Sequence, residues 1–192
     1  MGIIKKVQSS KFKVQSFTLI ETIIVVAITG LIMPVVFAIF FVILQQQAKI
    51  MRLQEVKRQG DFVLSTMKTT IRNNATEIYS NSDLAEANEV CNSVASEYNG
   101  GDGQNFYIKD KTGTGFRYYL SGTVINYSTG SPTPLTNSKV KITTFLIKCS
   151  RKSVYSPPIV SLSIVLEFNS TSLRPEENAT LTYNTNIKLK SF

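Results

Sequence analysis

The side chains that could do chemistry are few and lie far apart in this chain. It has 192 residues and no histidine, which excludes Ser-His-Asp and Cys-His nucleophile pairs and histidine metal sites. Its two cysteines, Cys91 and Cys149, have neither the C-x-x-C redox spacing nor a zinc-site spacing. We therefore expect no catalytic residue, no metal site, no cofactor and no enzymatic activity.

A glycine-rich turn and two aspartates give the remaining ligand signals. Residues 99–103 read Asn-Gly-Gly-Asp-Gly, which lacks the third glycine of a G-x-G-x-x-G phosphate loop and follows no clear strand. This pattern is typical of a turn. Calcium binding through Asp102 and Asp110 is the weaker alternative.

One apolar segment concentrates the hydrophobic residues. From Thr22 to Leu44 the sequence reads TIIVVAITGLIMPVVFAIFFVIL, without a charge. A bilayer core needs roughly 20 helical residues, so this segment is long enough to span it. A buried core helix is rarely apolar on every face for so long, and a cleaved secretory signal has a shorter apolar core followed by small residues. We expect a single membrane pass.

The segment before the span is basic. It contains four lysines and no acid: Lys5, Lys6, Lys11 and Lys13. The positive-inside rule would hold this leader, residues 1–16, in the cytoplasm. Four basic residues also follow the span, namely Lys49, Arg52, Lys57 and Arg58. Charge counting alone therefore leaves the orientation open.

Residues 16–32, between leader and span, read SFTLIETIIVVAITGLI. This stretch resembles the type IV pilin-like superfamily of pilins, minor pilins and type II secretion pseudopilins. Their precursors share a short basic leader, a cleavage point before a Phe-Thr-Leu-Ile-Glu run, and an apolar helix. Residues 17–21 match that run at every position. Ser16 departs from the pattern, because the family nearly always has Gly before the cleavage point, although Ser is also small.

The resemblance implies a processing and assembly route. A prepilin peptidase would cleave between Ser16 and Phe17, and Phe17 would be N-methylated. The protein would cross the bacterial cytoplasmic membrane once with its head outside, and would then enter an extracytoplasmic filament. Its partners would be other pilins or pseudopilins and, indirectly, an assembly platform protein and an ATPase. Gly30 and Pro34 resemble the helix-weakening residues of such segments, although both are also tolerated in ordinary membrane helices.

Glu21 is the one acid at the start of the apolar helix. A carboxylate in hydrocarbon costs free energy, so it is either a boundary charge at the interface or a charge compensated by a partner. The resemblance implies that Glu21 pairs with the Phe17 amine of a neighbouring subunit and sets the axial register. Such a pair favours assembly only where both charges are already poorly solvated.

Periodicity predicts that the helix continues beyond the span. Apolar residues recur at steps of three and four at Leu53, Val56, Gly60, Val63, Met67 and Ile71. We expect four parts: a leader at 1–16, a transmembrane or filament-core helix at 17–44, an amphipathic helix at 45–78, and a head at 79–192. The predicted class is α+β, with a long N-terminal α-helix, membrane-spanning in its first half, packed on an antiparallel β-sheet head.

Within the head, residues 73–108 hold six acids and no lysine or arginine, and predict a loop with a short helix near residues 84–96. Strands are predicted at 106–109, 116–120, 123–127, 139–149, 159–168 and 181–190. Ser121-Gly122 predicts a tight hairpin turn, and residues 130–134 a longer loop. This order of elements resembles PilW-type minor pilins and the J-type pseudopilin. Cys91 and Cys149 fit either a disulfide in an oxidising compartment or two buried thiols.

Three classes of function remain. The leading prediction is a structural minor pilin or pseudopilin. The alternatives are a tip adhesin or DNA-uptake subunit, and, because of Ser16, an unprocessed single-pass anchor. Residues 109–190 have eleven basic and four acidic side chains without a base-reading motif, so a nucleic-acid partner is not predicted. Charge segregation permits head-to-tail contacts between subunits.

Overall fold

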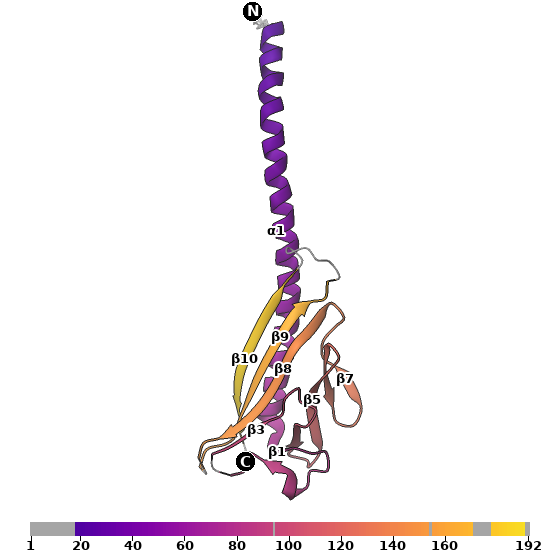
Figure 1. The fold of residues 1–192 in the computed structure, drawn as a ribbon, viewed down its shortest axis with the longest axis vertical. Coiled ribbons are helices and arrows are strands. Elements are labelled where there is room, and N and C mark those ends of the chain that lie inside the picture. Colours follow the sequence, from indigo (N-terminus) through magenta and orange to yellow (C-terminus); the bar gives the residue numbers. More distant parts are fainter. Residues whose placement is uncertain (1–17, 94, 154, 171–177, 191–192) are drawn as a thin grey trace, which may run out of the picture. The chain divides into compact units, whose positions relative to one another are not determined.

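The computed structural model describes residues 18–93, 95–153, 155–170 and 178–190 (Figure 1). The chain divides into two units, residues 1–44 and 45–192, and each is described by itself. One helix, α1 (Leu19–Asn74), contributes to both units. All strands lie in the second unit and form two antiparallel sheets. The predicted α+β class, a long N-terminal helix followed by an antiparallel sheet domain, is confirmed.

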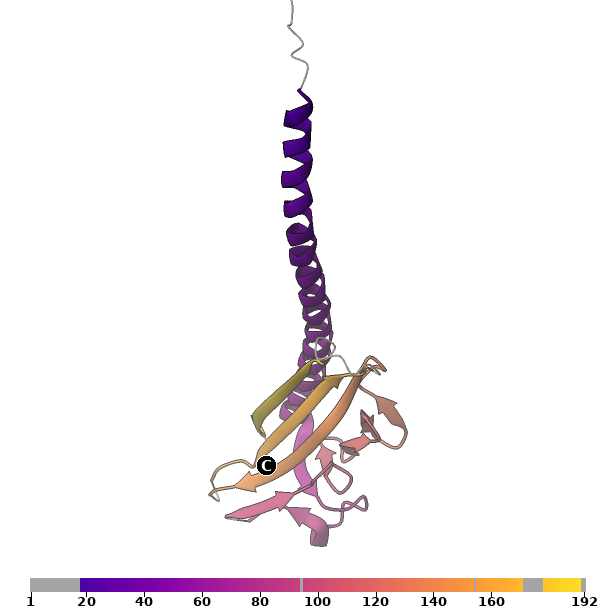
Figure 2. The ribbon, with the colours of Figure 1, turned by 45° about the horizontal axis from the view of Figure 1, so that its top comes forward.

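The second half of α1 packs on the strands through one stripe of side chains. The stripe predicted from the three- and four-residue spacing is buried: Val56, Gly60, Val63, Met67 and Ile71. Leu53 is partly buried against the same core. Strands β8 (Val140–Arg151), β9 (Ile159–Phe168) and β10 (Thr180–Lys188) lie across this part of the helix in both views (Figures 1 and 2).

The helix ends at Asn74, before the predicted boundary at residue 78. The next five residues form β1 (Ala75–Tyr79), which pairs with β4 (Tyr107–Asp110). Ala75 and Ile78 continue the helical spacing of apolar residues, so periodicity alone did not locate the end. Strand pairing decides the conformation here, because it buries both residues in the core while satisfying the backbone of β1.

Six strands form the first sheet, in the order β2-β1-β4-β5-β6-β7. The remaining bounds are β2 (Glu89–Val90), β5 (Gly115–Ser121), β6 (Val124–Ser128) and β7 (Pro132–Pro134). The predicted hairpin turn is confirmed, since Ser121 pairs with Val124 and Gly122 has a φ of 61°. The predicted loop at 130–134 instead contains β7, an edge strand in which two prolines are tolerated because an edge pairs on one side only.

Four strands form the second sheet, in the order β10-β9-β8-β3, with β3 (Ser96–Asn99) at one edge. Alternate side chains of β9 are buried along most of the strand, as the sequence alternation predicted. All six predicted strands are present, with ends within two residues of the predicted bounds. They are β4, β5, β6, β8, β9 and β10.

The prediction for residues 73–108 is wrong in detail. Instead of a loop with a short helix, the described residues before the predicted strand β4 form β1, β2 and β3 and one 3-10 turn, η1 (Glu86–Asn88). These strands are two to five residues long and carry charged side chains, so they lack a clear alternating pattern. Pairing with neighbouring strands stabilises them, and that pairing is not visible in the local sequence.

Cys91 and Cys149 form a disulfide that joins the connection between β2 and β3 to strand β8. Of the two alternatives left open by the sequence, the structure therefore has the bonded form. Both residues are buried in the core. Closing a loop of this length contributes about 4 kcal/mol by the loss of chain entropy in the unfolded state.

The close approach of α1 to β10 at Gly60 yields a first prediction. A Cβ at this position would collide with the ring of Tyr183, whose hydroxyl donates to the Lys57 carbonyl at 3.2 Å. Replacing a helical Gly by Ala usually stabilises a helix by about 1 kcal/mol. We expect Gly60→Ala to destabilise the head by about 1–3 kcal/mol instead, because the ring must move. Thermal unfolding of the full chain measures the change.

A matched control lies on the same helix. A Cβ at Gly30 would meet nothing within 4 Å, so Gly30→Ala should not lower the unfolding temperature. The double variant Gly60→Ala/Tyr183→Val lacks the ring that the added methyl would meet. It should therefore unfold at the same temperature as Tyr183→Val alone, or above it. A Gly60→Ala protein that unfolds at or above the wild-type temperature would contradict the packing argument.

Candidate functional site

The first turn of α1 holds Glu21 in a capping box. The backbone N–H of Thr18 donates to Glu21 Oε2 at 2.8 Å, and the Thr18 hydroxyl donates to the same oxygen at 2.9 Å. The Glu21 N–H in turn donates to Thr18 Oγ1 at 3.4 Å. Thr18 therefore caps the helix and Glu21 occupies the third helical position. This role was not predicted from the sequence, although Thr-x-x-Glu before an apolar run is its signature.

The capping box uses only half of the Glu21 carboxylate. Both hydrogen bonds from Thr18 end on Oε2, and no described residue donates to Oε1. An ionised carboxylate can accept several donors, so Oε1 retains its acceptor capacity. The arrangement orients the carboxylate at the start of the helix and leaves one oxygen for an additional donor.

The helix after Glu21 has an uncovered apolar surface. Large apolar side chains from Leu19 to Leu44 are exposed, for example Leu31 at 77% and Phe37 at 68%. The most apolar stretch of 18 residues has a mean hydropathy of 2.9, and none of it is buried. Among the described residues, α1 is the one helix long and apolar enough to cross a membrane. It is a candidate membrane anchor near the N-terminus.

Polar side chains within this segment are satisfied by the helix itself. The Thr22 hydroxyl donates to the Leu19 carbonyl at 2.8 Å, and the Thr29 hydroxyl donates to the Val25 carbonyl at 2.8 Å. These local bonds remove two polar groups that would otherwise oppose burial in hydrocarbon.

Gly30 and Pro34 occupy one turn of α1. The helix runs through both residues without an interruption. Pro34 has no N–H, so the Gly30 carbonyl, four residues earlier, loses its usual helical donor. Glycine at that position also lacks a Cβ and lowers helix propensity. The turn is therefore continuous but weaker than its neighbours.

Several predicted site residues lie outside the described residues. They are the cleavage-point residues Ser16 and Phe17 and the leader lysines Lys5, Lys6, Lys11 and Lys13.

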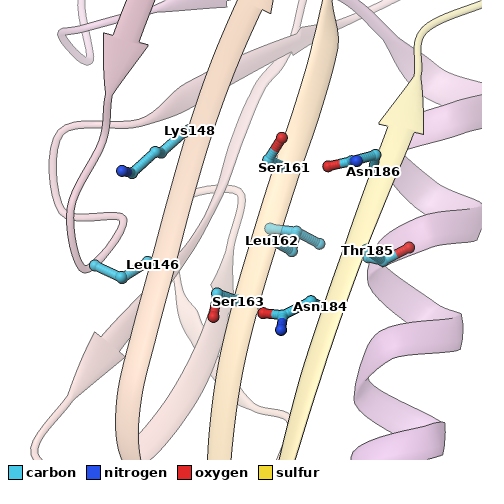
Figure 3. A pocket seen from close by; sticks show the side chains of 8 residues that line it. All are labelled: Leu146, Lys148, Ser161, Leu162, Ser163, Asn184, Thr185 and Asn186. Atoms are coloured by element: carbon cyan, nitrogen blue, oxygen red, sulfur yellow. The ribbon is translucent and has the colours of Figure 1, made fainter.

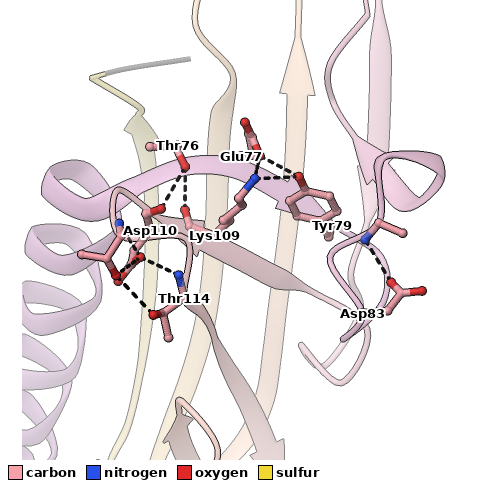
Figure 4. A network of polar contacts seen from close by, with 9 residues as sticks. Thr76, Glu77, Tyr79, Asp83, Lys109, Asp110 and Thr114 are labelled. Atoms are coloured by element: carbon pink, nitrogen blue, oxygen red, sulfur yellow. Dashed lines mark hydrogen bonds and ion pairs between the residues drawn. The ribbon is translucent and has the colours of Figure 1, made fainter.

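A polar clasp joins β1 to β4 in the head (Figure 4). Lys109 Nζ donates to Glu77 Oε2 at 2.7 Å, and the Tyr79 hydroxyl donates to the same oxygen at 2.6 Å. The hydrogen bond from Lys109, and next that from Tyr79, lower the pKa of Glu77. The same contacts raise the pKa of Lys109, chiefly through Glu77. These contacts stabilise the pairing of β1 with β4.

The two aspartates considered for calcium cap separate turns. Asp110 Oδ1 accepts from the Thr112 N–H at 2.8 Å and from the Thr114 N–H at 2.9 Å (Figure 4). Asp102 Oδ1 accepts from the Gln104 N–H at 3.1 Å. Within the described part of the chain, no group of three or more His, Cys, Asp or Glu residues is arranged to hold a metal ion.

A shallow groove of about 500 Å³ lies on the second sheet (Figure 3). Two cross-strand rows form its floor: Leu146, Ser163 and Asn184, and Lys148, Ser161 and Asn186. Hydroxyls, amides and one ammonium suit hydrogen bonding. The serines have no histidine to activate them, because the chain has none. This face was not predicted from the sequence, because its rows are set by the strand register.

The clasp predicts a pH dependence. Because the folded pKa of Glu77 lies below its ordinary 4.5, its contribution to stability is present above that value and is lost as the pH falls through the folded pKa. We expect Glu77→Gln to lower the unfolding temperature by about 1–3 °C at pH 7 and by less at pH 3. Thermal unfolding at both pH values tests this.

Glu86→Gln is the matched control, because Glu86 is exposed and takes no part in the clasp. It should leave the unfolding temperature unchanged at both pH values. An equal effect of Glu77→Gln at pH 7 and pH 3 would show that the ionised carboxylate does not stabilise the head.

Comparisons with protein-family models, with curated proteins and with solved structures find no match for this chain. The similarity to pilins therefore depends on the motif at residues 17–21 and on the order of one long helix followed by an antiparallel sheet domain.

Proposed function

We propose that this chain is a structural, non-enzymatic subunit of a type IV pilus-like filament, either a minor pilin or a pseudopilin. A prepilin peptidase would cleave it before Phe17 and methylate the new N-terminus. The single observation that carries the proposal is the Phe-Thr-Leu-Ile-Glu motif placed at the start of an exposed apolar helix that leads into a strand-rich head.

The exposed apolar half of α1 supports a protein that moves from a membrane into the core of a filament. Each large apolar side chain moved out of water contributes about 1.5–3 kcal/mol, so this surface needs a bilayer or other helices around it. A bundle of such helices in a filament core would cover the same side chains as the membrane does. Transfer between the two surroundings would then involve little change in hydrophobic free energy.

The geometry of Glu21 supports a charge pair between subunits. Cleavage after Ser16 leaves the Thr18 N–H in place, so the capping box can persist in the mature chain. The free Oε1 would accept the Phe17 amine of a neighbouring subunit. In apolar surroundings this attraction is much stronger than in water, so the pair would form as subunits associate and would set their axial register.

Processing gives a direct test. We expect mature protein from the native membrane to begin at Phe17, with an N-methyl group, as measured by intact-mass and N-terminal peptide mass spectrometry. Ser16→Gly should raise the processed fraction, because it restores the residue of the family pattern. A chain that keeps residues 1–16 in both proteins would overturn the filament proposal and favour the unprocessed anchor that Ser16 suggests.

Assembly depends on the charge of Glu21. Because Gln also completes a capping box, Glu21→Gln keeps the start of the helix but removes the charge. We expect it to reduce incorporation into sheared filaments at least about tenfold, with membrane levels unchanged, as measured by immunoblot. Deleting the whole chain should abolish piliation or secretion.

Thr18→Val is the matched control, because it removes the capping hydroxyl and keeps the carboxylate. It should assemble at near wild-type levels. Normal incorporation of Glu21→Gln would show that the charge pair is not needed.

A further inference from the structure

Strand β10 is a long, unprotected edge of the second sheet (Figure 1). The other three sheet edges are short: β2 has two residues, β3 has four with an exposed Glu97, and β7 has three, two of them proline. β10 has nine residues, no proline and no register shift, and its one charged residue is Lys188 at the end. Natural sheets usually protect an edge by short length, proline or charge, because an unprotected edge can pair with another chain.

The backbone of β10 faces β9 and the outer edge by turns. The Phe168 N–H donates to the Ala179 carbonyl at 2.8 Å, and the Leu189 N–H donates to the Pro158 carbonyl at 3.2 Å. Since the pairing with β9 is continuous, the odd-numbered residues between these two bonds also face β9. The even-numbered residues turn their N–H and C=O groups to the outer edge: Thr180, Thr182, Asn184, Asn186 and Lys188. All five are exposed, and no described residue hydrogen-bonds to their backbone groups.

A groove of about 560 Å³ adjoins the last part of this edge, where β10 meets the end of α1. Six of its lining residues matter here: Lys68 and Arg72 of α1, Asn186, Ile187 and Lys188 of β10, and Lys190. Four of these side chains are cations, and no acid lines the groove. We name this feature the basic groove.

The cations of the basic groove are not neutralised by the fold. Lys68, Arg72 and Lys188 are exposed and form no ion pair with any described residue. The Lys190 ammonium donates to Asn73 Oδ1 at 3.2 Å, which is a neutral partner. Lys68 and Arg72 are four residues apart on one face of α1, a spacing at which like charges destabilise a helix. An anionic partner would remove this repulsion.

We propose that β10 and the basic groove together bind an extended acidic segment of a partner protein. The segment would add to β10 as a fifth strand of the second sheet, and its acidic side chains would meet Lys68, Arg72 and Lys188. A peptide backbone offers an N–H and a C=O at each residue, so it can satisfy the donors and acceptors along the outer edge of β10. A phosphate, a lipid headgroup or a nucleic acid would satisfy the cations but has no such backbone. The free edge therefore selects a peptide among the possible anions.

The partner is a different protein from this chain. β10 of a second copy would also fit the edge, but it carries no acid and would leave the cations of the basic groove without a partner. Presentation of this surface on a filament depends on the proposed function, whereas the binding of an acidic strand does not.

The first test varies the ligand. The full chain in zwitterionic detergent is mixed with a fluorescein-labelled peptide of about 12 residues in which threonine and glutamate alternate, and binding is measured by fluorescence anisotropy. We expect binding at about 50 mM KCl that weakens at about 200 mM KCl. The same peptide with every backbone nitrogen methylated keeps its charges but has no N–H to donate. It should bind at least about tenfold more weakly.

The second test varies the protein. Asn184→Pro removes one outward N–H and leaves the bonds to β9 in place, so it should weaken binding about tenfold. Asn184→Ala is its matched control, because it keeps the N–H and should bind as wild type. Lys68→Gln/Arg72→Gln should weaken binding about fivefold at low salt and reduce the salt dependence. Its matched control is Lys111→Gln/Lys139→Gln, which removes two exposed cations outside the basic groove and should keep most of the affinity.

The methylated peptide tests the backbone bonds even where Asn184→Pro fails to fold. Equal binding of the methylated and unmethylated peptides would overturn the proposal, as would absence of binding at low salt or equal losses in both double variants. Equally strong competition by an oligo-dT of matched charge would identify a general polyanion site and would also overturn it. Glu21→Gln should bind the peptide as wild type, so failure here and failure of assembly are distinguishable.

Discussion

The apolar surface of α1 is the constraint on which the rest of the structure depends. A helix of 56 residues can satisfy its own backbone, but it cannot cover its own side chains. From residue 45 onwards the head covers one buried stripe, and the remaining faces are mostly polar. From Leu19 to Leu44 the described residues cover none of it. Hydrocarbon or other helices would cover it. The Thr22 and Thr29 hydroxyls and most backbone groups here are satisfied within the helix, which makes that burial feasible.

The strands of the head cover the apolar stripe of the second half of α1 through a closely packed interface. Gly60 lets the Tyr183 ring approach the helix, and polar contacts surround the buried apolar stripe. Glu55 accepts from Arg58 at 2.9 Å and from Asn137 at 3.0 Å, which ties the helix to the segment before β8. The Arg52 guanidinium lies 5.5 Å from the centre of the Phe168 ring. The apolar stripe supplies most of the stabilisation, and these rim contacts add specificity of fit.

The effect of the Glu21 charge depends on its surroundings. In the proposed filament the single carboxylate of Glu21 would lie in apolar surroundings, where one opposite charge has a strong and short-range effect. This arrangement suits a lasting axial register between subunits.

Local sequence alone determined the features that depend on local periodicity and composition. The apolar helix follows from an uncharged run long enough to span a bilayer, and the buried stripe from Val56 to Ile71 and the six predicted strands follow from repeats of 3.6 or 2 residues. The order of these segments gives the α+β class. Only the tertiary structure decided where α1 ends, because Ala75 and Ile78 fit helix and strand equally well. It also decided the short strands β1, β2 and β3 and the pairing of Cys91 with Cys149. Each of these depends on contacts between residues far apart in the chain, which no local pattern records.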